Sequence, residues 1–271
     1  MSALVTPAWL EERLDDPHLR IIESSVDKST YDAGHIPGAQ WVAPYGPLLI
    51  NGDNSAGNVI TPRQFAALMS ELGIEPTTPI VWYGDGFSRY AMRGFWTLGY
   101  YRHAGEFHVL DGGRERWIAE RRPLTMDVVR PPRTLYPEPA GADRGDEATW
   151  EDVRDAIGRR DAVVVDVRTQ GEYDGSDVRA AHGGHIPGAV HVDYTDATMG
   201  DNVLKPLDEL RRLYASRGIT PDKEVIAHCQ LGVRAAHTWF VLKHVLGYPN
   251  VKNYAGSWAE WGNRDDLPVE R

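Results

Sequence analysis

The sequence predicts an α/β protein of two tandem domains, each a parallel sheet flanked by helices. The segment GHIPGA stands at residues 34–39 and again at 184–189, which indicates an internal duplication. The chain has 271 residues, enough for roughly two domains that each bury a core. Short β-branched runs alternate with helix-like runs in both halves, a pattern typical of parallel sheets covered on both faces.

Four apolar runs are predicted to be strands, and they correspond in pairs. They are LRIIESS (19–25) and AVVVDVR (162–168), which precede the repeated segment, and IVWYGDG (80–86) and EVIAHCQ (224–230), which follow it. This pairing places Asp85 opposite Cys229. Trp117 and Trp261 lie 32 residues beyond these two positions, so both halves follow one plan.

Three stretches have the apolar spacing of helices, at residues 61–73, 148–158 and 234–247. Hydroxyl side chains at helix starts accept backbone hydrogen bonds, and glycine allows the left-handed turn that ends a helix. We therefore expect N-caps at Thr61 and Thr149 and helix ends at Gly73, Gly158 and Gly247.

Between the halves, residues 126–146 are rich in proline and charge and show no periodicity, so we expect a linker there. The two domains are then expected at 1–125 and 147–271.

Composition narrows the class of protein. Hydrophobic residues at 42% and charged residues at 25% are ordinary for a globular protein. The net charge of −10 argues against nucleic acid or an anionic membrane as the main partner. The first residues lack a basic start followed by an apolar core, and no apolar run approaches the ~20 residues that span a bilayer, so we expect a cytoplasmic protein.

Cys229 is the only cysteine, so it forms neither an internal disulfide nor a thiolate-rich metal site. A lone cysteine is more commonly an inert core residue. Here it is expected where a strand passes into a helix, and there loop N–H groups and the helix dipole stabilise a thiolate. Gly232 allows a tight loop and Arg234 offers a planar donor for an oxyanion, which favours a reactive thiol.

These features together resemble a tandem-domain rhodanese, the sulfurtransferase family that includes thiosulfate and 3-mercaptopyruvate sulfurtransferases. The resemblance covers the whole length and is carried by GHIPGA in both halves, DVRTQGEYDG from Asp166, CQLGVR from Cys229, NYAGSWAEWGN from Asn253 and LPVE from Leu267. It implies two rhodanese-like domains with catalysis only in the C-terminal one. A carboxylate cannot carry a persulfide, so Asp85 implies that the first domain is catalytically silent.

The resemblance further implies that Cys229 takes a sulfane sulfur from thiosulfate and passes it to cyanide or a thiol, without a metal or an organic cofactor. Arg234 is expected to hold the sulfonate end of the donor. The amides of the loop are expected to cradle the transferred sulfur, and the loop residues are Gln230, Leu231, Gly232, Val233 and Arg234.

Several other polar residues are candidates for roles at the site or in the core. Arg168 either borders the crevice or forms an ion pair with Asp166 that braces the following loop. Arg179 is a candidate clamp for a donor carboxylate. His228 is expected to face away from the thiol because successive side chains of a strand point to opposite faces. His35 and His185 occur in both halves and are expected to anchor turns, and the tryptophans to pack in the core.

Three alternatives remain open. A related phosphatase loop has the spacing C-x5-R, whereas this loop is C-x4-R. A persulfide carrier or regulatory module would use the same thiol without efficient turnover. A 3-mercaptopyruvate enzyme resembles the chain less, because such enzymes have a smaller loop and an arginine for the substrate carboxylate where this sequence has Glu172. Thiosulfate is therefore the expected donor, while the physiological donor and acceptor, the pathway and the oligomeric state are not determined by the sequence.

Overall fold

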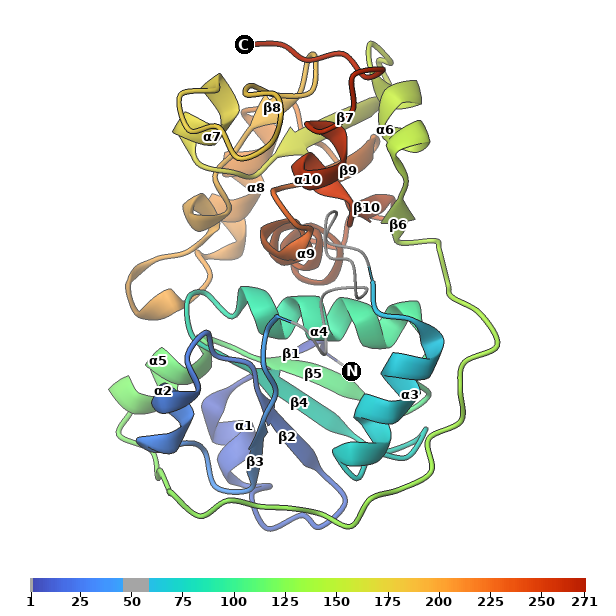
Figure 1. Ribbon diagram of the computed structural model, residues 1–271. Coiled ribbons are helices and arrows are strands. Elements are labelled where there is room, and N and C mark those ends of the chain that lie inside the picture. Colours follow the sequence, from blue (N-terminus) through green and yellow to red (C-terminus); the bar gives the residue numbers. More distant parts are fainter. Residues whose placement is uncertain (1, 46–58) are drawn as a thin grey trace. The chain divides into compact units, whose positions relative to one another are not determined.

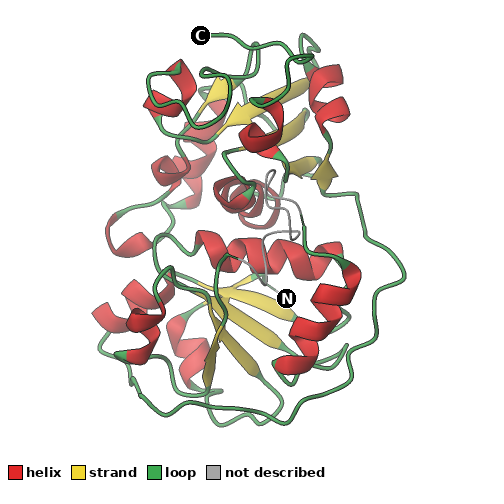
Figure 2. Ribbon diagram, in the orientation of Figure 1, coloured by secondary structure: helices red, strands yellow, loops and turns green. Residues whose placement is uncertain are grey.

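The computed structural model describes residues 2–45 and 59–271. The described chain divides into two compact units, the first made of residues 2–45, 59–143 and 199–204 and the second of residues 144–198 and 205–271. Each unit contains a five-stranded sheet with helices packed on it (Figure 1, Figure 2). The predicted α/β class with two like domains is confirmed.

The first unit has the strand order β1-β5-β4-β2-β3, and every pair is parallel. The strands are β1 (Leu4–Val5), β2 (Arg20–Glu23), β3 (Ala39–Trp41), β4 (Ile80–Tyr83) and β5 (Phe107–Leu110). The helices are α1 (Pro7–Glu11), α2 (Lys28–Asp32), α3 (Pro62–Glu71), α4 (Arg89–Tyr100) and α5 (Gly113–Ala119).

The second unit repeats this plan with the order β6-β10-β9-β7-β8, again all parallel. Its strands are β6 (Glu147–Ala148), β7 (Ala162–Asp166), β8 (Val190–His191), β9 (Glu224–His228) and β10 (Val251–Tyr254). Its helices are α6 (Trp150–Ala156), α7 (Gln170–Asp174), α8 (Leu207–Ala215), α9 (Val233–Phe240) and α10 (Ser257–Trp261). A short 3-10 turn occupies Tyr194–Ala197 and a π-helical turn occupies Val241–Val245. A further 3-10 turn, Gly200–Asn202, lies in the segment that belongs to the first unit.

The expected helix caps are present. Thr61 and Thr149 each accept a hydrogen bond from the backbone three residues on, which begins α3 and α6. Gly73, Gly158 and Gly247 have φ of +66°, +78° and +76°, the left-handed conformation that ends a helix.

The repeated segment works as a turn anchor in both units. His185 Nδ1 lies 2.9 Å from the Tyr173 carbonyl oxygen, and the two rings stack with centroids 3.8 Å apart. His185 also pairs through its backbone with Glu270 near the end of the chain. His35 makes the same contacts with Tyr31 in the first unit, at 3.0 Å and 3.7 Å. The motif therefore fixes the chain where it enters β3 and β8.

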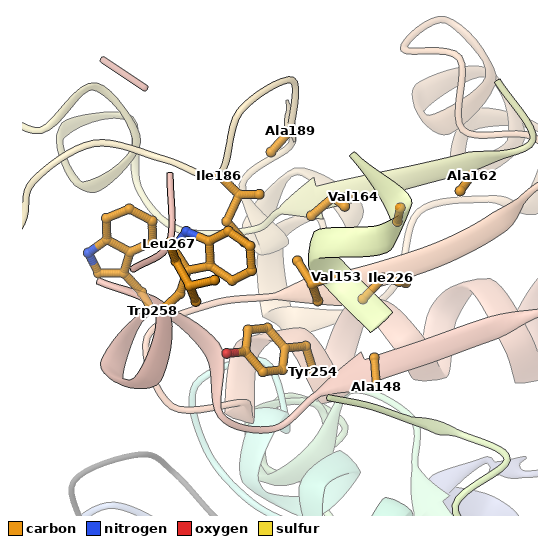
Figure 3. Close-up of a cluster of buried hydrophobic side chains, with 12 residues drawn as sticks. Ala148, Val153, Ala162, Val164, Ile186, Ala189, Ile226, Tyr254, Trp258 and Leu267 are labelled. Atoms are coloured by element: carbon orange, nitrogen blue, oxygen red, sulfur yellow. The ribbon is translucent and has the colours of Figure 1, made fainter. Parts of the chain in front are cut away.

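A buried apolar cluster fills one face of the second sheet (Figure 3). It combines strand residues such as Val164 and Ile226 with Trp258 and Trp261 from α10. Both tryptophans are at most 1% exposed, as expected for core residues. This core sets the position of α10, which begins beside the Cys229 loop.

The expected linker, residues 126–146, contains no helix or strand. Much of it nevertheless lies against the first unit: the Thr134 amide donates to the Ser70 carbonyl at 3.0 Å and the Asp143 amide to the Tyr100 carbonyl at 2.7 Å. Contacts place the division between the units at residues 143 and 144. In the part of the chain that the structure describes, no helix has both the length and the apolar character needed to cross a bilayer.

Candidate active site

Cys229 directly follows β9 and precedes α9, as predicted, and its side chain is almost fully buried. Helix α9 begins at Val233, one residue earlier than expected, with Gly232 as N-cap at φ +72°. The start of α10 holds the loop from the other side: the Trp258 amide donates to the Cys229 carbonyl at 2.9 Å and the Ala259 amide to the Gln230 carbonyl at 3.0 Å. Because two carbonyls of the loop are bound there, the loop conformation is set by the second unit's own core.

Arg234 is the second residue of α9, and its guanidinium makes a bidentate ion pair with Glu172. Nη1 donates to Oε2 at 2.7 Å and Nη2 to Oε1 at 2.8 Å. Burial lowers the pKa of Arg234, but its hydrogen bonds to Glu172 and its electrostatic interactions with Cys229 and Glu172 raise it, and the net pKa lies above the usual value. A hydrogen bond to Cys229 contributes to this shift. A permanent cation therefore lies beside the only thiol.

Glu172 is buried and connects Arg234 to the start of α7. Besides Arg234, its Oε2 accepts from the Thr169 amide at 3.1 Å and the Thr169 hydroxyl at 3.0 Å. Burial raises the pKa of Glu172, yet the hydrogen bond and charge of Arg234 outweigh burial and lower it to about 2. The carboxylate is ionised at neutral pH, and its charge balances that of Arg234.

Arg179 and Gln230 lie near this pair. The Arg179 guanidinium is half exposed, donates to Asp177 Oδ2 at 2.7 Å and 2.9 Å, and lies 3.7 Å from Glu172 Oε1. The Gln230 side-chain amide donates to the Arg179 carbonyl at 3.1 Å. The structure thus brings Arg179 and Gln230 next to the Arg234–Glu172 pair, with Asp177 as a further counter-charge.

Arg168 is placed differently from a ligand-binding residue. Its guanidinium is 1% exposed, donates to both oxygens of Asp166 at 2.6–3.1 Å and to the Gly184 carbonyl at 2.7 Å, and stacks on Trp258 at 4.3 Å. These partners bind Nε and Nη2 of Arg168 inside the core. Of the two roles expected for Arg168, these contacts favour the ion pair that braces the loop.

The first unit contains a similar ion pair without a thiol, although its arginine stands at the position of Trp258 and not of Arg168. There Arg114 pairs with the buried Glu23 at 3.3 Å and donates to the Gly34 carbonyl, which corresponds to Gly184. A buried arginine–carboxylate pair thus also occurs in the unit without a cysteine, which favours a structural role.

His228 is fully buried beside this brace, with Nε2 3.5 Å from Asp166 Oδ2. Burial lowers its pKa to about 4, against the opposing effect of the Asp166 charge. The imidazole is therefore neutral near pH 7 and packs under the strand end.

The loop of the first unit differs by one residue from the expected alignment. The Val167 amide donates to the His228 carbonyl, and the equivalent Ser24 amide donates to the Tyr83 carbonyl. The residue after Tyr83 is Gly84, so Gly84 rather than Asp85 takes the place of Cys229. Asp85 is an additional residue, and its carboxylate accepts from the Val26 amide at 3.3 Å.

The same register is seen on the opposite side of that loop. The Arg114 amide donates to the Gly84 carbonyl at 3.0 Å, as the Trp258 amide does to Cys229. A Cβ atom at Gly84 would lie 2.4 Å from the Ser24 carbonyl oxygen. The first unit therefore has no room for a cysteine side chain at position 84.

Two features of the site were not predicted. One is the ion pair between Glu172 and Arg234, which are 62 residues apart. The other is the hydrogen bond that the Ser257 hydroxyl accepts from the Cys229 amide at 3.1 Å. Aligning LDGGRERW (110–117) with YAGSWAEW (254–261) sets Gly113 opposite Ser257, so the sequence does mark this position as different in the two halves.

Within residues 2–45 and 59–271, no group of three or more His, Cys, Asp or Glu side chains could hold a metal ion. The chemistry available at the site is that of a nucleophilic sulfur beside an arginine and the N-terminal end of a helix.

The chain is similar to curated proteins named for sulfur carriage and sulfur transfer. The chain is 38% identical to the sulfur carrier protein TtuD of Thermus thermophilus, over 100% of this chain and 97% of that protein. It is 37% identical to a thiosulfate sulfurtransferase of Corynebacterium glutamicum, over 98% of this chain and 90% of that protein.

Among solved structures, the anaerobic ergothioneine biosynthesis enzyme of Chlorobium limicola superposes with a TM-score of 0.85 at 24% identity, over 99% of this chain and 70% of that one. This likeness concerns the fold alone. The family model of the rhodanese-like domain matches residues 6–120 and 149–264, and the chain therefore belongs to the rhodanese-like family, with two such domains in tandem.

Proposed function

We propose that the protein is a thiosulfate sulfurtransferase that carries sulfur as a persulfide on Cys229. The observation that carries this proposal is the position of the only thiol, at the end of β9 and the start of α9, next to the Arg234 cation. Relatives at 37–38% identity named for sulfur transfer or sulfur carriage support it.

The proposed reaction has two displacement steps. The Cys229 thiolate attacks the outer sulfur of thiosulfate, the S–S bond of the donor breaks, and sulfite leaves with the bonding electron pair. Cyanide or a thiolate then attacks the outer sulfur of the persulfide, and Cys229 leaves as the thiolate. Both steps conserve electrons, so neither an oxidant nor a cofactor enters.

The loop supplies the binding site in this proposal. The amides of Gln230, Leu231, Gly232, Val233 and Arg234 surround the transferred sulfur, and the start of α9 favours negative charge there. Arg234 meets the sulfonate end, because its planar guanidinium matches an oxyanion. Arg179, half exposed at the edge, is the second cation available to the donor.

A second candidate is a persulfide carrier that accepts sulfur from another protein or a small thiol and turns over thiosulfate poorly. The charges near Cys229 favour it to some extent: Arg234 is paired with Glu172 and Arg179 with Asp177, so the attraction for a dianion is partly cancelled. A slow steady state with thiosulfate and cyanide, together with complete persulfide formation in a single turnover, would select the carrier.

The test compares the wild type with Cys229→Ser. After treatment with thiosulfate, intact-protein mass spectrometry should show one added sulfur on the wild type and none on the variant, because an alcohol forms no persulfide. Asp85→Ala is a control in the corresponding loop of the other unit and should keep normal turnover of thiosulfate and cyanide. Sulfur transfer by Cys229→Ser at the wild-type rate would refute the assignment.

The acceptor in this proposal is cyanide or a thiol, and neither nucleic acid nor a membrane takes part. A cytoplasmic location is part of the proposal because a free thiol persists in a reducing compartment.

A further inference from the structure

Ser257, the first residue of α10, has a backbone conformation that serine rarely adopts. Its φ is +51°, and its side chain is fully buried. A residue other than glycine at such an angle carries a conformational cost, which persists only where the surroundings require that residue. The serine hydroxyl is therefore expected to have a function that glycine lacks.

The hydroxyl makes two hydrogen bonds of fixed direction. It donates to the Tyr254 carbonyl at 2.7 Å, so its proton is committed, and a lone pair accepts from the Cys229 amide at 3.1 Å. The next amide, on Trp258, holds the Cys229 carbonyl. Both backbone groups of the nucleophile are thus bound by consecutive residues of α10.

The first unit provides an internal comparison, because the same backbone occurs there without a thiol. Gly113 corresponds to Ser257 and has φ +52°, and the following amide binds the Gly84 carbonyl as Trp258 binds that of Cys229. The strained position is thus occupied by glycine in the silent unit and by serine in the unit that contains the thiol.

Serine and glycine are also interchanged at the N-cap of the helix that follows the loop. In the first unit the N-cap of α4 is Ser88, with φ +52°, whereas in the second unit the N-cap of α9 is Gly232. A Cβ atom on Gly113 would lie 2.4 Å from Ser88 Oγ, so one serine hydroxyl fills this space in either unit. Ser88 Oγ finds no hydrogen-bond partner among the described residues, whereas Ser257 Oγ binds the amide of the nucleophile.

We propose that Ser257 is a positioning residue for the sulfur chemistry: its hydroxyl holds the Cys229 amide so that the sulfur stays directed at the loop amides and Arg234. The inference rests on the proposed function for its biological meaning, but the positioning concerns the thiol itself. It is therefore testable by a reaction that needs no sulfur donor.

The experiment compares Ser257→Gly and Ser257→Ala with Ser88→Gly. Ser257→Gly and Ser88→Gly both relieve a positive φ. Only the two variants of Ser257 remove a hydrogen bond to Cys229. Because the chain has one cysteine, alkylation by iodoacetamide reports on Cys229 alone. The second-order rate of alkylation at pH 7 should fall ~3- to 10-fold in both Ser257 variants, the equivalent of one hydrogen bond, and stay unchanged in Ser88→Gly.

Single-turnover persulfide formation from thiosulfate should fall by the same factor, while the half-saturating thiosulfate concentration stays the same because Ser257 binds no donor. Circular dichroism at the assay temperature checks that each variant is folded. Wild-type alkylation rates in both Ser257 variants, or an equal loss in Ser88→Gly, would overturn the positioning role. Slowed alkylation in a protein that forms no persulfide with thiosulfate would instead support the positioning of Cys229 and refute the proposed donor.

Discussion

Replacing Glu172 by Gln tests the electrostatics of the site without changing its shape. In the folded protein the carboxylate is buried, binds both Nη atoms of Arg234 and caps the first turn of α7 through Thr169. Glutamine has nearly the same size and resembles a protonated glutamate, so the variant removes the charge and leaves the volume.

The expected cost follows from the pKa of Glu172, which falls from 4.5 to about 2 because the Arg234 hydrogen bond and charge outweigh burial. At 1.36 kcal/mol per pKa unit, this shift stabilises the fold by about 3 kcal/mol at pH 7. Because the folded-state pKa lies below the unfolded one, the stabilisation is complete above pH 4.5 and is lost as the pH falls towards 2. Glu172→Gln should therefore be about 3 kcal/mol less stable than the wild type at pH 7 and only about 2 kcal/mol less stable near pH 3.5.

Urea denaturation followed by tryptophan fluorescence at several pH values measures both quantities. Asp152→Asn is the matched control, because Asp152 makes the same reciprocal cap with Thr149 at the start of α6 but, within the described part of the chain, no ion pair. It should cost at most about 1 kcal/mol. A Glu172→Gln penalty no larger than that of the control, or one independent of pH, would show that the ion pair with Arg234 does not stabilise the fold.

Three further predictions concern neighbouring residues. Arg234→Ala removes the bidentate partner of the buried Glu172 carboxylate and leaves Arg179, 3.7 Å away, as its nearest cation, so urea denaturation should show a loss of about 3–5 kcal/mol. The KM for thiosulfate should rise at least ~10-fold, and an unchanged KM would mean that the loop amides alone hold the donor. Gly84→Cys places a Cβ 2.4 Å from the Ser24 carbonyl oxygen, so we expect a lower Tm and no second added sulfur by mass spectrometry, whereas a second persulfide would contradict the steric argument. Burial lowers the pKa of His228 to about 4, below its unfolded value of 6.5, so the wild type should lose up to about 3 kcal/mol of stability between pH 6.5 and 4; His228→Gln should lack this dependence, and an identical pH profile would exclude His228 as its source.

Local patterns in the sequence were sufficient for the fold. Thr61 and Thr149 begin helices because a hydroxyl binds an amide three residues away, and Gly73 and Gly158 end them because only glycine adopts the required φ without cost. The duplication of GHIPGA gave the two-unit plan, because both copies fold by the same contacts.

The position of Cys229 was predictable for the same reason. An apolar run that ends at a polar loop and is followed by an amphipathic run places the thiol between strand and helix, and the structure confirms that placement. The roles of the residues around it stay predictions.

The details of the site depend on contacts between segments far apart in the chain, and no local pattern specifies them. In the first unit Gly84, and not Asp85, occupies the position that Cys229 occupies in the second. The hydrogen bonds that involve Ser24 and Arg114 set this register, and the length of the apolar run does not. Arg168 points into the core, where it stacks on Trp258, a residue from a segment much later in the chain.

Three segments meet around the nucleophile: the start of α7, the loop before α9 and the start of α10. The charge of Arg234 is balanced by Glu172, 62 residues earlier, and the amide of Cys229 is bound by Ser257, 28 residues later. Propensity and periodicity act over a few residues, so they predicted the strands, helices and caps and the place of the thiol. The partners of that thiol were decided only when packing of the sheet brought the ends of distant segments to within hydrogen-bonding distance.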